Sequence, residues 1–310
     1  MAKFKDAIII YNPASSGFNG DKLKEITEKL REYGIKPDIF SSKYQGHMIN
    51  LVKNADEDNR LIITLGGDGT VGEAYTALNS IEQKGVYAHI PTGTTNDMAK
   101  NFDIIKKKPK DIMEDILNGE IKMFDTYSIN GRISAYTSVF GYLAHVPFIT
   151  PSSHKKNLGY GAYVLAAGKD LMKKPIQYNI SYETDNMKGT DNFILGAISN
   201  SKGFAGVDLF SDAKLDDGKL ELLLIKDLSP RLIASLVVPF FTNNIDLSKY
   251  KDHILVDQSS EIKLTFNENF LYHPVDVDGE DSKIRPNYKD RDLIFKMEKP
   301  VRVMKRKQGK

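Results

Sequence analysis

The loop Gly66–Thr70 (GGDGT) combines three glycines with one acid, and it follows the apolar run Leu61–Leu65 and precedes a stretch with helical spacing, residues 71–79. A strand that ends in glycines and continues into a helix presents backbone N–H groups and a positive helix end to a phosphate. Asp68 would repel bound phosphates unless a cation lay between them. The loop therefore predicts a metal–nucleotide site rather than a simple anion site.

Two other interpretations of this loop are weaker. Residues 67–72 satisfy the dinucleotide pattern G-x-G-x-x-G, but that pattern expects an acid about 20 positions later, at the end of the next strand. This chain has Ile90-Pro91-Thr92 there, which disfavours an NAD site. A tight turn without a ligand is the remaining alternative. Thr70 and Glu73 also fit a capping box, with Thr70 expected at the helix N-cap.

Two further loops follow expected strands and are rich in small polar residues. Asn12–Gly17 (NPASSG) lacks the lysine of a P-loop, and Pro91–Asp97 (PTGTTND) brings a second acid, Asp97. Ligands of open α/β sheets bind at the carboxyl ends of the strands, where all three loops fall. Mg²⁺ is usually held by one or two carboxylates with waters and substrate phosphates, so Asp68 and Asp97 fit that need.

The pattern of the chain predicts the elements that position these loops. Residues 1–125 alternate strand and helix patterns, which predicts an α/β nucleotide-binding domain with an open sheet. From residue 126 to 298 short alternating strands dominate, including 133–140, 176–183, 193–200 and 293–296, with helices expected only near 161–172 and 230–241. We expect a mostly antiparallel β-sandwich there, an active site in the cleft between the domains, and a tail, 299–310, that packs back on the first domain.

Composition narrows the function classes. The 310 residues carry a formal net charge of +2, which gives no general case for nucleic-acid binding. The absence of cysteine excludes disulfides and thiolate chemistry, and the six histidines show no metal spacing. No run approaches the length of a membrane span. We expect a cytoplasmic protein whose local basic clusters meet an anionic membrane surface: 106–108, 155–156, 173–174 and 302–310.

Two acidic segments in the second half of the chain could do chemistry. Asp212–Gly218 (DAKLDDG) reads either as a turn or as a cation site that uses backbone carbonyls. Asp276–Asp281 (DVDGED) is richer in acids than a turn requires, and one of its carboxylates could accept a proton from a substrate hydroxyl during phosphoryl transfer.

Together these segments resemble the soluble diacylglycerol kinase family of bacteria and, more widely, the lipid kinases that include sphingosine kinases. The matching motifs occur in the family's order and span nearly the whole chain: YNPASSG at 11–17, GGDGT at 66–70, IPTGTTND at 90–97, DAKLDDG at 212–218 and VDGE at 277–280. The resemblance implies an enzyme that uses ATP and Mg²⁺ to phosphorylate a lipid hydroxyl at the membrane surface, with diacylglycerol converted to phosphatidate.

The resemblance also implies roles for individual residues. Glu280 corresponds to the general base, Asp68, Asp97 and Asp125 to the acids of a catalytic metal and water network, and Lys214, Asp217 and Lys219 to a structural Mg²⁺ site that uses the two lysine carbonyls. The implied nucleotide contacts are Asn12, Pro13, Ala14, Ser15, Ser16, Ser42, Gly66, Gly67, Asp68, Gly69, Thr70, Glu73 and Thr94. Gly72 departs from the family, which usually has Asn there, and 140–151 match the substrate side poorly.

Alternatives stay open at this point. They are a kinase of another lipid alcohol such as a sphingoid base or polyprenol, an NAD kinase, and a non-catalytic nucleotide- or lipid-binding regulator. A homodimer is also compatible with the sequence.

Overall fold

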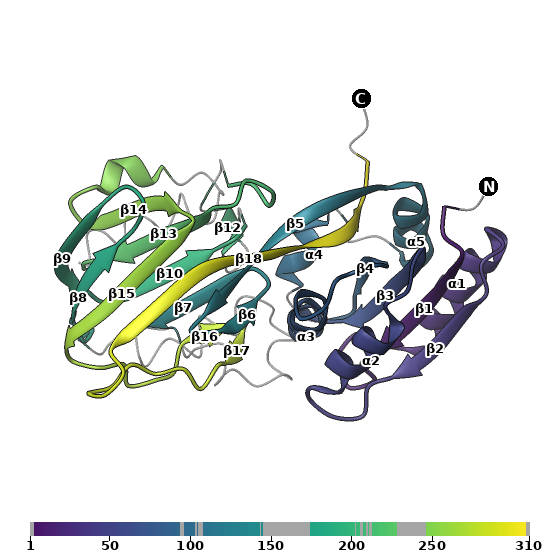
Figure 1. The fold of residues 1–310 in the computed structure, drawn as a ribbon, viewed down its shortest axis with the longest axis horizontal. Coiled ribbons are helices and arrows are strands. Elements are labelled where there is room, and N and C mark those ends of the chain that lie inside the picture. The colour runs from purple at the N-terminus through teal and green to yellow at the C-terminus, as the bar shows by residue number, and fades with distance from the viewer. Residues whose placement is uncertain are drawn as a thin grey trace. The chain divides into compact units, whose positions relative to one another are not determined.

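The protein divides into two compact units, one formed by residues 1–126 with 299–310 and the other by residues 127–298 (Figure 1). The computed structural model describes residues 3–93, 96–102, 104, 108–142, 144, 174–201, 203–204, 207–208, 210, 213–227 and 246–307. Several expected features lie outside this part: the helices near 161–172 and 230–241, residues 106–107, 155–156, 173 and 308–310 of the basic clusters, Thr94, and the side chain of Asp97.

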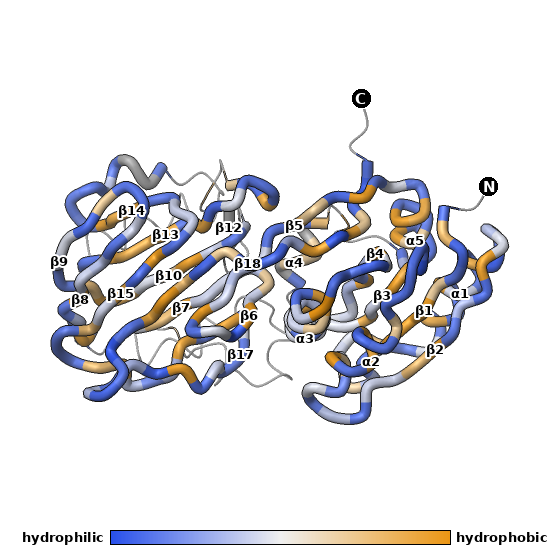
Figure 2. Tube along the Cα trace, in the orientation of Figure 1, coloured by the Kyte–Doolittle hydropathy of each residue, from blue (hydrophilic) through white to orange (hydrophobic). Residues whose placement is uncertain are grey.

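The first unit is built on a parallel sheet in the order β2-β1-β3-β4. Its strands are β1 (Asp6–Tyr11), β2 (Pro37–Ser41), β3 (Arg60–Gly66) and β4 (Val86–Pro91). Figure 2 shows hydrophobic stretches along β1 and β3, which lie inside the sheet and read as nearly continuous apolar runs because both faces are covered. The expectation of an open α/β sheet is confirmed.

Helices connect these strands and pack on the sheet. They are α1 (Gly20–Glu32), α2 (His47–Ala55), α3 (Asp68–Asn79), α4 (Asp97–Asn101) and α5 (Pro109–Asn118). Asn19 caps α1, since its Oδ1 accepts from the amide of Lys22 at 2.9 Å. The segment after residue 298 belongs to this unit, where Asn79 Nδ2 donates to the Lys299 carbonyl at 2.9 Å and Gln83 Nε2 to that of Arg302 at 2.9 Å.

The second unit packs two antiparallel sheets face to face. One has the order β14-β13-β10-β7-β16-β17 and the other contains β18-β15-β8-β9. Large buried side chains fill the space between them, among them Phe140 and Leu222 from the first sheet and Phe266 and Phe295 from the second. The predicted antiparallel sandwich is confirmed.

The strands of this unit are mostly short. They are β6 (Arg132–Ser134), β7 (Thr137–Gly141), β8 (Tyr178–Glu183), β9 (Lys188–Phe193), β10 (Leu195–Ser199), β11 (Gly203–Phe204), β12 (Val207–Asp208), β13 (Leu220–Ile225), β14 (Ile254–Ser259), β15 (Glu261–Glu268), β16 (Asp276–Val277) and β17 (Glu280–Asp281), with a 3₁₀ helix at Leu247–Tyr250. Two longer strands, β5 (Glu120–Ile129) and β18 (Asp292–Lys305), have residues in both units.

Two strand predictions need correction. The strand expected at 133–140 is broken into β6 and β7, because the amides of Ala135, Tyr136 and Thr137 bond to the carboxylate of Asp278. The strand expected at 293–296 extends over 14 residues as β18 despite Pro300.

Candidate functional site

The loop after β1 is fixed by its own side chains and by the loop after β4. Asn12 Oδ1 accepts from the amide of Ala14 at 2.9 Å, which closes a turn over Pro13. Ser15 Oγ donates to the carbonyl of Thr92 at 2.6 Å and lies 2.9 Å from the Thr92 hydroxyl. The amide of Gly17 also donates to the Thr92 carbonyl, at 2.8 Å. The exposed residues Pro13, Ala14 and Ser16 are thus held beside the residues that follow β4.

Gly66 and Gly67, in the loop after β3, have little room for side chains. A Cβ on Gly66 would collide with the side chain of Thr70, and a Cβ on Gly67 would lie 3.3 Å from the Cα of Gly93. The amides of Thr92 and Gly93 donate to the Gly66 carbonyl at 2.7 and 3.2 Å. The two loops therefore touch backbone to backbone next to the start of α3, and a helix N-terminus is a favourable position for a phosphate.

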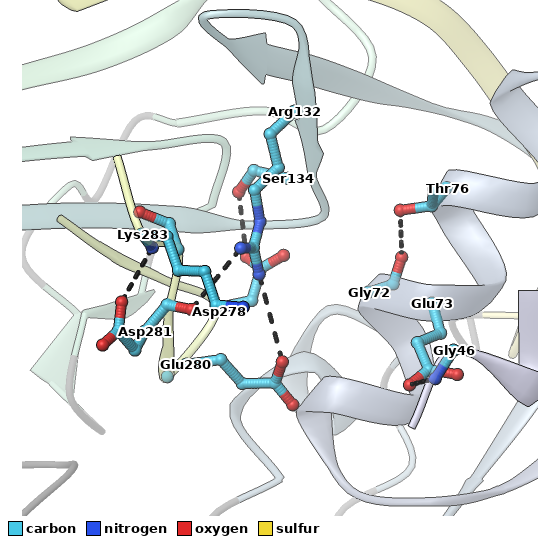
Figure 3. Close-up of polar contacts among 12 residues, drawn as sticks. Gly46, Gly72, Glu73, Thr76, Arg132, Ser134, Asp278, Glu280, Asp281 and Lys283 are labelled. Atoms are coloured by element: carbon cyan, nitrogen blue, oxygen red, sulfur yellow. Dashed lines mark hydrogen bonds and ion pairs between the residues drawn. The ribbon is translucent and has the colours of Figure 1, made fainter. Parts of the chain in front are cut away.

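The helix start differs from the sequence expectation. Gly67 is the N-cap of α3, so Thr70 lies inside the first turn and is buried, and its amide donates to the Gly67 carbonyl at 3.0 Å. The predicted capping box is wrong because α3 begins at Asp68, two residues before Thr70. Glu73 instead accepts from the amide of Gly46 at 2.8 Å (Figure 3).

The bond between Glu73 and Gly46 joins α3 to the loop after β2. The amide of Ser42 donates to the Tyr11 carbonyl at 2.9 Å, so Ser42 lies beside the end of β1. Gly46 has a φ of 85°, which glycine adopts without strain, and it precedes α2. Gly72, where the family usually has Asn, lies within α3, and its carbonyl accepts from the hydroxyl of Thr76 at 2.8 Å.

Asp68 connects the glycine loop to α4. Its Oδ1 accepts from the amide of Met98 at 3.0 Å, and its side chain is half-buried. Asn96 holds the same segment, because its Oδ1 accepts from the amide of Gly93 at 2.9 Å and its Nδ2 donates to the Gly93 carbonyl at 2.7 Å. The φ of Asn96 is 51°, a left-handed conformation that asparagine tolerates. Asp125 lies on β5 with a half-buried side chain.

Three polar side chains of β3 and β4 form a buried hydrogen-bonded group close to the ends of these strands. Thr64 Oγ1 lies 2.6 Å from the hydroxyl of Tyr87 and 3.0 Å from Nδ1 of His89. Burial lowers the pKa of His89 to about 3, so this imidazole is neutral at physiological pH. These strand residues support the loops and lie in the core.

Glu280 directly follows a two-residue hairpin turn in the second unit. Asp278 and Gly279 have φ values of 55° and 84°, and Val277 pairs with Glu280 across the turn. This is the geometry of a type I′ turn, which favours Asp-Gly. The Glu280 side chain is 41% exposed, and its Oε2 lies 4.0 Å from Nη2 of Arg132.

The carboxylate of Asp278 is buried and fully engaged. It accepts from the hydroxyl of Ser134 at 2.9 Å and from the amides of Ala135, Tyr136 and Thr137 at 2.8, 3.0 and 3.1 Å. Burial is the largest influence on its pKa and raises it, although the four hydrogen bonds act in the opposite direction. Asp278 thus fixes the hairpin that carries Glu280.

The candidate structural metal residues lie before β13. Asp217 Oδ1 accepts from the amide of Lys219 at 3.2 Å, and its Oδ2 accepts from Gln258 Nε2 at 3.2 Å. Gly218 between them has a φ of 69°. This turn places one carboxylate close to the backbone of Lys219, and carboxylate with carbonyl oxygen is a donor set that suits a hard cation.

Within the described residues, no three His, Cys, Asp or Glu side chains gather as a metal cluster. The first unit does bring together Asn12–Ser16, Ser42, Gly66–Thr70 and Glu73. Sequence reasoning named the segments that contain Thr92, Asn96 and Asp278 but not the bonds that these residues make, and it missed Arg132. The Asp-Gly dipeptide at 278–279 and the Asn-Gly dipeptide at 130–131 were usable signals, since both are typical of two-residue hairpins.

An α/β unit with hydrogen-bonded, glycine-rich strand-end loops is followed in this chain by an antiparallel sandwich, and this combination defines the class of the protein. Residues 6–129 match the model of the diacylglycerol kinase catalytic domain. The chain is 27% identical over 281 residues to a diacylglycerol kinase of Bacillus subtilis, covering 89% of this chain and 90% of that protein. A diacylglycerol kinase of Staphylococcus saprophyticus is 29% identical over 229 residues, 72% of this chain and 73% of that one.

Solved structures share the fold. A crystal structure from Bacillus anthracis strain Sterne has a TM-score of 0.81 at 22% identity, with 98% of both chains covered. Another from the same strain, described as a diacylglycerol kinase, has a TM-score of 0.73 at 18% identity, again with 98% of both chains covered. The resemblance to diacylglycerol kinases predicted from the sequence is confirmed, together with its class, a lipid kinase enzyme, and the catalytic-domain model itself matches residues 6–129.

Proposed function

We propose that this protein transfers the γ-phosphoryl group of ATP to the free hydroxyl of diacylglycerol and so forms phosphatidate. The observation that carries the proposal is the interlocked group of strand-end loops within a domain that matches the diacylglycerol kinase catalytic model. Asn12–Ser16, Ser42, Gly66–Thr70, Glu73 and Thr94 are assigned to the nucleotide. Glycine amides and the N-terminus of α3 would hold its phosphates.

Mg²⁺ fits the acids of this site. Asp68 offers carboxylate oxygen at the start of α3, and Mg²⁺ needs only one or two carboxylates when phosphates and waters supply its other ligands. Asp68, Asp97 and Asp125 are the residues we assign to hold the ion and its waters. When bound, Mg²⁺ would neutralise phosphate charge. A second, structural Mg²⁺ is assigned to the Asp217 carboxylate and the carbonyls of Lys214 and Lys219.

Glu280 is assigned as the general base. Phosphoryl transfer needs an acceptor for the proton of the attacking hydroxyl, and a half-exposed carboxylate on a rigid hairpin can serve as one. Because the transition state is largely dissociative, most of the catalysis comes from positioning and electrostatics rather than from strong base activation.

The lipid substrate requires access to a membrane. The described residues include no helix long and apolar enough to cross a bilayer. We propose peripheral association of a cytoplasmic enzyme through its basic clusters, of which Lys108, Lys174 and Arg302–Lys307 lie in the described part. Each basic residue near an anionic surface would contribute about 1 kcal/mol to this association. A homodimer is proposed as the assembly to test alongside it.

The deciding experiment offers ATP and Mg²⁺ with diacylglycerol, a sphingoid base, a polyprenol and NAD in parallel. Phosphatidate as the dominant product would support the proposal. A dominant product from another acceptor would replace diacylglycerol, and ATP binding without turnover on any of them would favour a non-catalytic regulator.

A further inference from the structure

Two tight turns in the second unit place one cation and one anion face to face. Asn130 and Gly131 have φ values of 46° and 82°, and Ile129 pairs with Arg132 across them, so this is also a type I′ hairpin. Arg132 therefore occupies the position directly after its turn, just as Glu280 does after Asp278-Gly279. Figure 3 shows the guanidinium of Arg132 extending toward the carboxylate of Glu280.

Each turn is anchored independently of the ion pair. The side chain of Asn130 accepts from the amide of Ile294 at 2.7 Å and donates to the carbonyl of Asp292 at 2.9 Å, which fixes the first turn to β18. The buried carboxylate of Asp278 fixes the second turn to residues 134–137. Both backbones are thus held, and only the two side chains remain to be oriented.

Arg132 makes two contacts with the strand that carries Glu280. Its Nη2 lies 4.0 Å from Glu280 Oε2, and its Nη1 donates to the Asp281 carbonyl at 3.5 Å. The side chains of Arg132 and Glu280 are 37% and 41% exposed. An ion pair this long and this exposed adds little to folding stability, so stability does not account for the arrangement.

We propose that Arg132 is a positioning residue that orients the Glu280 carboxylate toward the lipid hydroxyl during phosphoryl transfer. The inference rests on the proposed function, in which Glu280 is the general base. The planar guanidinium can contact a carboxylate and a neighbouring carbonyl at once, which a lysine ammonium does less well. Arg132 itself touches neither substrate nor nucleotide in this proposal and acts only through Glu280.

The test compares Arg132→Gln and Arg132→Lys with a matched control, Lys283→Gln. Lys283 is an exposed cation three residues from Glu280, so its replacement removes the same charge while Arg132 and Glu280 themselves stay unchanged. We expect Arg132→Gln to lower kcat for diacylglycerol roughly ten- to a hundredfold, as misplacement of a catalytic group does, with the KM for ATP and the thermal midpoint unchanged. Arg132→Lys should recover part of kcat, and the control should behave as the wild type.

A double-mutant cycle separates orientation of Glu280 from direct contact with a phosphate. In a Glu280→Asp background, the loss on Arg132→Gln should shrink to less than threefold, because residues that act as a unit are not additive. Full additivity, a raised KM for ATP, or wild-type kcat in Arg132→Gln would each overturn the inference. If the wild-type enzyme phosphorylates no lipid, the proposed function itself fails, and that outcome is distinct from wild-type activity that Arg132→Gln leaves intact.

Discussion

Replacement of Gly93 by alanine tests whether the strand-end loops act as one phosphate-binding surface. A Cβ at this position would lie 2.6 Å from the Cα of Gly67 and 2.7 Å from Oδ1 of Asn96. The first neighbour is backbone and cannot rotate away. Ordinary contacts of a Cβ begin at 3.4 Å. The glycine loop and the loop after β4 must therefore move apart by most of the difference between 2.6 and 3.4 Å.

This separation has two measurable consequences. Overpacking of this kind costs about 1–3 kcal/mol of folding free energy, so the protein should remain folded. Movement of catalytic groups by about 1 Å can cost about a hundredfold in rate. We therefore expect Gly93→Ala to lower kcat/KM for ATP by about a hundredfold while the thermal midpoint falls only moderately.

Gly20→Ala is the matched control. Gly20 begins α1 in the same unit, and a Cβ there would meet nothing within 4 Å. Steady-state kinetics at varied ATP and calorimetry on both variants separate the effects, and the control should behave as the wild type. Wild-type kcat/KM for ATP in Gly93→Ala would show that contact between these loops is not needed, and the reasoning about the site would be wrong.

Three further predictions concern single side chains. Because burial lowers the pKa of His89 to about 3, from 6.5 in the unfolded chain, its contribution to stability is present above pH 6.5 and is lost as the pH falls toward 3. Denaturant unfolding should lose about 2 kcal/mol between pH 7 and pH 5 through this residue, and His89→Gln should remove that loss. Ser15→Ala removes the 2.6 Å bond to the Thr92 carbonyl and should cost about 1 kcal/mol and raise the KM for ATP, measured by calorimetry and kinetics. An unchanged KM would argue against a shared surface. Asp278→Ala leaves four donors without their acceptor and should destabilise the protein by at least about 3 kcal/mol in denaturant unfolding, whereas a loss below about 1 kcal/mol would contradict its anchoring role.

Local patterns predicted the architecture of the first unit well. The apolar runs at β1 and β3 and the helical spacing between them identify an open α/β sheet, and this topology places the strand-end loops side by side. The contacts between those loops were not predictable, because the bond from Ser15 to Thr92 joins residues 77 positions apart.

The failures of sequence reasoning occur where a distant group competes with a local one. Thr70 and Glu73 have capping-box spacing, yet α3 begins earlier and Glu73 bonds to Gly46. The alternating pattern at 133–140 predicts one strand. The amides of Ala135 and Tyr136 donate to the Asp278 carboxylate instead of to a neighbouring strand, so the segment forms two strands, β6 and β7. β18 continues past Pro300, which local rules treat as a strand breaker.

Phosphatidate formation from diacylglycerol and ATP, compared between the wild type and Asp68→Asn, tests the central claim most directly. The substitution keeps the size of the side chain and an oxygen that can accept from the Met98 amide, but it removes the charge assigned to Mg²⁺. We predict phosphatidate from the wild type and loss of most activity in Asp68→Asn, with an unchanged thermal midpoint. Turnover by Asp68→Asn close to that of the wild type, or no phosphatidate from the wild type, would contradict the assignment.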